Sequence, residues 1–98
     1  MITRIVKMTF KPEQVESFLD IFENSARHIA SFEGCLSLEL VQGKDNKNIF
    51  FTISKWNSEE DLQKYRNSGL FKETWAKTKV LFDDKPQAWS TVTRYKVK

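Results

Sequence analysis

The sequence predicts an α+β fold with the ferredoxin-like order β-α-β-β-α-β, in which one four-stranded antiparallel sheet carries its helices on one face. Two observations predict this fold. Apolar residues alternate in strand-like runs at both ends of the chain and on either side of a polar turn near its middle. Helical periodicity fills the two long segments between these runs. With 98 residues, the chain has the length of one domain, expected to span residues 1–98.

The first strand is expected from Ile2 to Phe10, and these two residues share one face with Val6 and Met8. Arg4 is the single exception on that otherwise apolar face. The alternation predicts an amphipathic strand whose more apolar side carries one guanidinium group.

The longest helix is expected from Glu13 to about Phe32. Pro12 can open this helix, because proline suits the first helical turn, and Gly34 can stop it. Its apolar residues recur at helical spacing on one face, namely Val15, Phe18, Leu19, Phe22, Ala26 and Ile29.

Two further strands are expected from Cys35 to Gln42 and from Ile49 to Trp56, with Phe50 and Phe51 on opposite faces of the later strand. The polar segment 43–48 lies between them and predicts a hairpin turn. The earlier strand has a clean apolar face, which holds Leu36, Leu38 and Leu40.

The second helical region follows the third strand. Ser58 is expected to cap it, with Asp61 in the position of a capping box. The Asn67-Ser68-Gly69 segment should interrupt the helix, and a further helix should run from Leu70 to about Val80. The last strand is expected from Gln87 to Val97.

Apolar side chains occupy both faces of the predicted sheet. The face away from the helices would hold Ile5, one phenylalanine of the third strand, and Trp89 or Val92. A single layer of helices covers only one face. Burial of the free face against a second copy is the simplest solution, so we expect a homodimer.

The charge pattern argues against a nucleic-acid partner. The net charge is +3, and the 16 basic residues are scattered without a block. The RNA-recognition module shares the same element order but needs glycines in its third strand and stacking aromatics in its first and third. Here Asn48–Ser54 has no glycine and the first strand has no central aromatic residue.

The cysteine count and the N-terminus bear on location. Cys35 is the only cysteine, which excludes an intrachain disulfide and a cysteine-rich metal site. No apolar run reaches the length of a membrane helix, so no membrane partner is expected. The strand pattern begins at once and leaves no room for a signal peptide. These features favour a cytoplasmic protein.

Several short motifs occur together in one order along nearly the whole chain. They are the helix start at Pro12, the turn Phe32-Glu33-Gly34-Cys35-Leu36, the strand end Ser54-Lys55-Trp56, and then Ser58, Leu62, Tyr65, Ser68 and Phe71. This pattern resembles the antibiotic-biosynthesis monooxygenase family of dimeric α+β barrels. The resemblance implies two sheets packed face to face in a homodimer, with one ligand pocket per subunit between sheet and helices. Family members include oxidases of polycyclic aromatic phenols, quinol monooxygenases and haem-degrading monooxygenases.

The haem-degrading branch relies on an Asn in the first strand, a Trp in the second helical segment and a haem-ligating His ten residues later. Here the first strand has no Asn, Tyr65 stands at the Trp position, and Trp75 stands at the His position. Trp75 cannot ligate iron, because its ring nitrogen is only a donor. Many other members place a His where Tyr65 stands. We therefore expect no standard haem-cleaving site and no metal site, and no cofactor is assigned.

The candidate pocket residues are aromatic: Trp56, Tyr65, Phe71, Trp75 and Phe22. They could line a pocket for a flat aromatic ligand, with Tyr65 supplying one oriented hydroxyl group. The alternative for each residue is plain hydrophobic core or dimer contact.

Five other residues carry reactive or charged groups. His28 and Cys35 are interpreted as a surface residue and a structural residue, because a lone His or Cys is a weak catalytic signal. Arg4, Lys7 and Glu39 lie in strands. Such groups could handle protons or bind an acidic substrate group beside a pocket, or they could pair across strands.

The predicted function is cofactor-independent oxygenation of an aromatic or quinol-type small molecule, in which the substrate's own anion reacts with dioxygen. The alternative is a small-ligand-binding homodimer of the same fold without catalysis. A small aromatic molecule is the expected partner in both cases. The catalytic residues stay unassigned.

Overall fold

The computed structural model describes residues 1–98. In chain order, its elements are β1 (Ile2–Thr9), the 3-10 helix η1 (Pro12–Gln14), α1 (Val15–Ala30), β2 (Cys35–Gln42), β3 (Ile49–Trp56), α2 (Glu59–Arg66), α3 (Gly69–Lys79) and β4 (Gln87–Thr91). The strands form one sheet in the order β2-β3-β1-β4, with every neighbouring pair antiparallel. The α+β, ferredoxin-like fold predicted from the sequence is confirmed.

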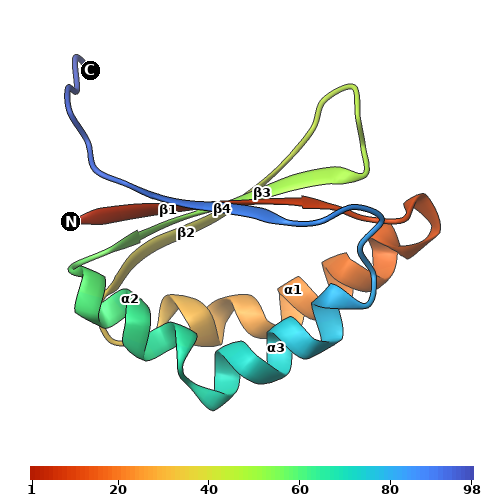
Figure 1. The fold of residues 1–98 in the computed structure, drawn as a ribbon, viewed down its shortest axis with the longest axis horizontal. Coiled ribbons are helices and arrows are strands. Elements are labelled where there is room, and N and C mark those ends of the chain that lie inside the picture. Colours follow the sequence, from red (N-terminus) through yellow and green to blue (C-terminus); the bar gives the residue numbers. More distant parts are fainter.

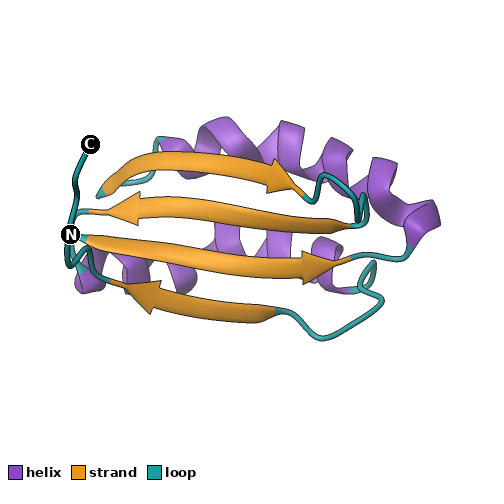
Figure 2. Ribbon diagram, turned by 90° about the horizontal axis from the view of Figure 1, so that it is seen from above, coloured by secondary structure: helices purple, strands orange, loops and turns teal.

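The molecule has two layers. Figure 1 shows the sheet lying over α1, α2 and α3, with no element on its opposite side. Figure 2 looks onto that open side and shows the four strands in front of the helices. None of the helices combines the length and apolar character that crossing a membrane requires.

The core lies between the sheet and α1. Met8, Phe10, Phe18 and Phe50 are all at most 3% exposed and form one cluster. The rings of Phe10 and Phe18 stack with centroids 4.1 Å apart. The apolar face predicted for the first strand is therefore the face that meets the helices. Burial of such side chains contributes roughly 1.5–3 kcal/mol each.

The two serine caps set the limits of α2 and α3. Ser58 Oγ accepts a hydrogen bond from the Asp61 N–H at 3.1 Å, as the capping pattern predicted. Ser68 Oγ accepts from the Phe71 N–H at 3.1 Å and donates to the Tyr65 carbonyl at 2.6 Å. One hydroxyl group thus links the end of α2 to the start of α3.

Gly34 joins α1 to β2 in a conformation that requires glycine. Its φ is +86°, in the left-handed region that side chains with a Cβ disfavour. A Cβ at this position would also overlap the Asp61 side chain of α2. The helix stop predicted at Gly34 therefore has a second role, because it lets α2 approach the turn.

The structure differs from the sequence prediction in the limits of the first helix, the direction of Leu36 and the end of the last strand. The first helical segment begins with a 3-10 turn and ends at Ala30, not Phe32. Leu36 is 55% exposed, because a β-bulge between Cys35 and Ser37 turns it off the apolar face of β2. The last strand ends at Thr91, not Val97. Thr91 pairs with Thr3, and β1 begins only one residue before Thr3, so residues after Val92 have no strand to pair with.

The open face of the sheet carries the second set of apolar side chains. Ile5 lies opposite Ile53 on one side and Trp89 on the other, and Val41 lies opposite Phe51. Side chains paired in this way project from the same face of a sheet. Trp89 is 45% exposed. The predicted apolar character of both faces is therefore present in the fold.

Candidate functional site

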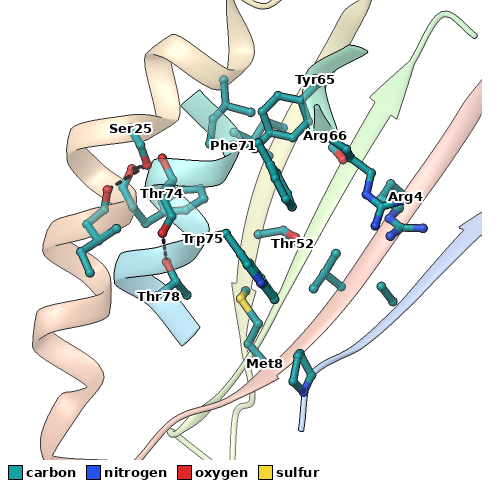
Figure 3. A pocket seen from close by; sticks show the side chains of 18 of the residues that line it. Arg4, Met8, Ser25, Thr52, Tyr65, Arg66, Phe71, Thr74, Trp75 and Thr78 are labelled. Atoms are coloured by element: carbon teal, nitrogen blue, oxygen red, sulfur yellow. Dashed lines mark hydrogen bonds between the residues drawn. The ribbon is translucent and has the colours of Figure 1, made fainter. Parts of the chain in front are cut away.

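A cavity of about 270 Å³ lies between the sheet and the three helices. Its lining is mostly apolar, with 13 hydrophobic residues among 21. Figure 3 shows this space from close by, with α1 and α3 on one side and the strands on the other. Ligand pockets usually measure about 300–1,000 Å³, so this cavity suits a compact molecule with an apolar body.

All five aromatic residues named from the sequence line this cavity: Trp56, Tyr65, Phe71, Trp75 and Phe22. The position of each residue along its strand or helix determines the face from which its side chain projects. The inward face of β3 supplies Trp56, and the faces of α1, α2 and α3 that meet the sheet supply the others. Whether these residues bind a ligand stays a prediction.

Trp56 forms the buried end of the aromatic wall. It is fully buried, and its indole Nε1–H donates to Ser54 Oγ at 3.0 Å. The only polar group of this side chain is therefore already satisfied. The Tyr65 ring stacks on the indole, with centroids 5.0 Å apart and planes at 22°. Trp56 offers a ring face to the site and no hydrogen bond.

Phe71 and Trp75 continue the wall along α3. Their rings lie almost parallel, at 9°, with centroids 5.9 Å apart. The Tyr65 ring meets Phe71 edge-on at 5.3 Å. Figure 3 shows the Phe71 and Trp75 rings projecting from α3 toward the strands, with Met8 of β1 below Trp75. Three side chains from two short helices thus present a continuous aromatic surface.

The wall has two polar groups without a partner in the chain, the Tyr65 hydroxyl group and the Trp75 indole N–H. The Tyr65 hydroxyl group makes no hydrogen bond within the chain, whereas the backbone carbonyl of the same residue accepts from Ser68. Burial, and secondarily the charge of Cys35, raises the pKa of Tyr65 to about 12. The hydroxyl group therefore stays protonated near neutral pH and can donate to an acceptor in the cavity.

Hydroxyl groups on the helical side of the cavity were not identified from the sequence. Ser25 of α1 and Thr78 of α3 are buried, and Thr74 lies one turn before Thr78. Ser25 Oγ donates to the Ile21 carbonyl at 2.8 Å, and Thr78 Oγ1 donates to the Thr74 carbonyl at 2.8 Å. Each donor is used within its own helix, so these groups offer the cavity acceptor lone pairs.

Two arginine residues line the cavity near the sheet. Arg4 of β1 donates from Nη1 to Ser90 Oγ of β4 at 3.0 Å. Arg66 is the last residue of α2. Burial, and then the charge of Arg66, lowers the pKa of Arg4, while Glu59 acts in the opposite direction. The sequence had singled out Arg4 as the charged residue on an apolar face, but it gave no sign of Arg66.

The remaining candidates lie outside the cavity lining. His28 is exposed and lies on a separate polar groove between α1 and α3. Cys35 donates from Sγ to the Ser37 carbonyl at 3.6 Å, and burial raises the pKa of its thiol group. A raised pKa lowers the fraction of reactive thiolate. Lys7 and Glu39 lie on the open face of the sheet, since they pair with Phe51 and Ile53. No three His, Cys, Asp or Glu residues gather as a metal site.

Sequence comparison finds relatives with a shared segment. A protein of Natronomonas pharaonis, named "Putative heme-binding protein", is 28% identical over 79 residues. The match covers 81% of this chain but only 13% of that protein. The chain therefore spans about an eighth of the length of this curated relative, whose name describes a much larger protein.

Solved structures share the fold over almost the full chain. A crystal structure described as an antibiotic biosynthesis monooxygenase superposes with a TM-score of 0.90 at 15% identity, and covers 95% of this chain and 98% of that one. SnoaB of Streptomyces nogalater, described as a cofactor-independent oxygenase, superposes with a TM-score of 0.88 at 16% identity, over 98% and 95% of the two chains. At such identities the likeness establishes the fold alone.

The family model described as "Antibiotic biosynthesis monooxygenase" matches residues 1–77. That segment runs from β1 through most of α3, so it contains the aromatic wall and both cavity arginines. The match and the fold agree with the resemblance found in the sequence. The chain belongs to the antibiotic biosynthesis monooxygenase family.

Proposed function

We propose that the protein binds an aromatic or quinol-type small molecule in this cavity and oxygenates it without a cofactor. The observation that carries the proposal is the aromatic wall of Tyr65, Phe71 and Trp75, in which Tyr65 carries a protonated hydroxyl group without a hydrogen-bond partner in the chain. Flat rings gain stacking energy on such a wall. The hydroxyl group would fix the direction of the ring by donating to an oxygen atom of the substrate.

The proposed reaction needs no reductant other than the substrate. A quinol would give a hydroxylated quinone and water, so that one oxygen atom of dioxygen enters the product and the other leaves as water. The substrate supplies all the electrons, first as its deprotonated, electron-rich anion. The protein would contribute orientation and exclusion of water. Tyr65 would hold the substrate oxygen by hydrogen bonding and would not act as a base at neutral pH.

The cavity lining offers no general base, which favours substrates whose own hydroxyl groups are acidic. The lining contains no carboxylate, histidine or cysteine. A substrate hydroxyl group would therefore lose its proton to water, and the nearby positive charges of Arg4 and Arg66 would stabilise the anion. Quinols and polycyclic phenols meet this requirement, because charge spreads over their rings.

We propose that the working protein is a cytoplasmic homodimer. The support is the open sheet face, where Ile5, Phe51, Ile53 and Trp89 form an apolar surface that no helix covers. A second copy placed on this face would bury both surfaces and leave each cavity between sheet and helices accessible. The single cysteine suits a reducing compartment.

Haem is the group that the names of the relatives suggest, and the cavity residues do not fit a His-ligated haem. The lining has no histidine, and His28 lies on another groove. The side chains of iron-ligand type in the cavity are Met8 and Tyr65. A phenol with a pKa of about 12 is a poor anionic ligand near neutral pH. The proposed reaction therefore does not use haem.

The second candidate is a ligand-binding dimer without catalysis, which the absence of a base from the lining favours. Oxygen uptake with reduced naphthoquinone separates the two functions. Catalysis predicts uptake above the rate of spontaneous oxidation, with loss of that excess in Tyr65→Ala. Saturable quenching of tryptophan fluorescence by the quinol, without excess uptake, would support the binder. If the quinol caused neither quenching nor excess oxygen uptake, both functions would be refuted.

A further inference from the structure

Arg4 is the charged residue on the cavity face of β1. Its neighbours along this face are Val6 and Met8, which line the same cavity. Burial lowers the pKa of Arg4, so its charge is partly removed from water. A charge in such surroundings destabilises the fold unless a partner compensates for it. Arg4 is thus unusual both as a charged residue on an apolar strand face and as a charge whose burial lowers the stability of the fold.

The compensation within the chain is incomplete. Arg4 lines the cavity and makes one side-chain hydrogen bond, to the neutral Ser90 hydroxyl group, and the other N–H donors of its guanidinium have no acceptor in the chain. The one ion pair of the protein joins Lys77 to Glu73 on α3. Glu59 attracts Arg4 only at longer range, and its Oε1 accepts from Gln63 at 2.9 Å.

A second cation lies beside the first. Figure 3 shows the Arg66 side chain extending from the end of α2 toward Arg4, on the strand side of the cavity. The charge of Arg66 acts directly on Arg4, and Arg66 has no ion-pair partner. Two like charges held together repel one another in the absence of an anion. The pair therefore lies where a bound anion would relieve both charges.

We propose that Arg4 and Arg66 form an oxyanion subsite at the rim of the cavity, which selects a flat aromatic ligand that carries a carboxylate group. The inference rests on the proposed function, since it assumes that this cavity binds a small aromatic molecule. The guanidinium group matches a carboxylate through paired N–H donors. Arg66 is exposed and Arg4 is half-buried, so the carboxylate would sit at the rim and keep part of its hydration.

The subsite also fixes how the ligand lies. With its carboxylate between the two guanidinium groups, the ligand's rings would point away from the rim, toward Phe71 and Trp75. Tyr65 precedes Arg66 in α2, so the neutral donor and the cation come from adjacent positions. A carboxylate at one end and a hydroxyl or keto oxygen near Tyr65 would then hold the ring at two points. Substrates with both groups would bind in one orientation.

The test compares two probes that share one ring system, naphthoate and the corresponding neutral naphthalenemethanol. Quenching of tryptophan fluorescence reports binding, because Trp56 and Trp75 line the cavity. Charge-assisted hydrogen bonds are roughly twice as strong as neutral ones, so naphthoate should bind at least about tenfold more tightly than the alcohol. Rising salt should weaken naphthoate binding and leave alcohol binding unchanged.

Three variants test whether Arg4 and Arg66 cause the preference for naphthoate over the alcohol. Arg4→Gln removes the charge and keeps a donor for Ser90, while Arg66→Gln changes an exposed residue and should fold normally. Each should lower naphthoate affinity about tenfold and leave alcohol affinity unchanged. Lys64→Gln is the matched control, since it removes an exposed charge of α2 that does not line the cavity. Its naphthoate affinity should equal that of the wild type.

The outcomes separate the subsite from the pocket. Equal binding of both probes, with no effect of the arginine variants, would overturn the subsite and leave the aromatic pocket intact. Loss of naphthoate affinity in Lys64→Gln as large as in the arginine variants would also overturn it, because general surface charge would then explain the preference. If neither probe quenched fluorescence, the pocket and the subsite would both be refuted.

Discussion

Replacement of Tyr65 by phenylalanine separates a ligand-binding role from a packing role. The ring of Tyr65 contacts Trp56 at 5.0 Å, Phe71 at 5.3 Å and Phe32 at 5.5 Å between centroids. Phenylalanine keeps all three contacts. The hydroxyl group has no hydrogen-bond partner in the chain, so its removal leaves no protein group unpaired. The free energy of unfolding should change by less than about 0.5 kcal/mol.

Ligand affinity should respond much more strongly. If Tyr65 donates to a substrate oxygen, its loss leaves that oxygen unpaired in an apolar cavity, at a cost of about 1–3 kcal/mol. This corresponds to an increase of about 5- to 150-fold in Kd. Methylnaphthalene, which lacks the oxygen of naphthol, should bind wild type and Tyr65→Phe equally well.

The assay pairs a thermal melt with a fluorescence titration of naphthol and methylnaphthalene. Tyr95→Phe is the matched control, because Tyr95 is 87% exposed and lies outside the cavity lining. Tyr65→Ala calibrates the packing contribution, since loss of the ring should destabilise the protein by roughly 3–5 kcal/mol. An unchanged naphthol Kd in Tyr65→Phe would refute the hydrogen-bonding role and leave Tyr65 as part of a purely apolar wall.

Four further predictions concern the fold, its pH dependence, assembly and haem. Gly34→Ala should destabilise the protein by at least about 1–2 kcal/mol in a denaturant titration, because φ is positive and the Asp61 side chain fills the Cβ position; equal stability would contradict the reading of this turn. The Tyr65 hydroxyl group loses its proton near pH 10 in the unfolded chain and near pH 12 in the folded protein. The free energy of unfolding should therefore fall between pH 10 and pH 12, by up to about 2–3 kcal/mol more in wild type than in Tyr65→Phe. Parallel curves of stability against alkaline pH for the two proteins would show that the hydroxyl group is not desolvated. Sedimentation equilibrium at micromolar concentration should give about twice the 11.6 kDa chain mass, and a monodisperse monomer would contradict the proposed dimer. Titration with haemin should give no sharp Soret band of the His-ligated type, and a stoichiometric band of that type would show that the assignment of cavity ligands is wrong.

Much of the fold could be predicted because its signals are local. The alternation of Val6, Met8 and Phe10 assigned the inward face of β1, and the stripe through Phe18 and Phe22 assigned that of α1. Ser58 was predicted as a helix cap and Ser68 as part of a helix break, and both signals are local, because a serine cap acts on a backbone N–H three residues away. Errors arose where a distant segment decides the outcome.

The end of β4 is such a case. Residues 92–97 keep an apolar alternation that favours a strand, but a strand needs hydrogen-bonding neighbours. The only neighbour of β4 is β1, and β1 begins at Ile2. Pairing therefore stops at Thr91, and the segment with Val92, Tyr95 and Val97 is exposed. No property of that segment by itself could reveal this limit.

The site shows the same division. The sequence by itself determined the supply of rings in residues 56–75, the missing histidine, and the charge at Arg4 on an apolar face. Only the tertiary structure decided that Arg66 lies beside Arg4, that Ser90 contacts a residue 86 positions earlier, and that Ser25 and Thr78 meet the same cavity. Periodicity and capping depend on residues three or four positions apart, so they can be read along a chain. Contacts between elements depend on the order and register of the strands, which the chain fixes only when the whole core packs.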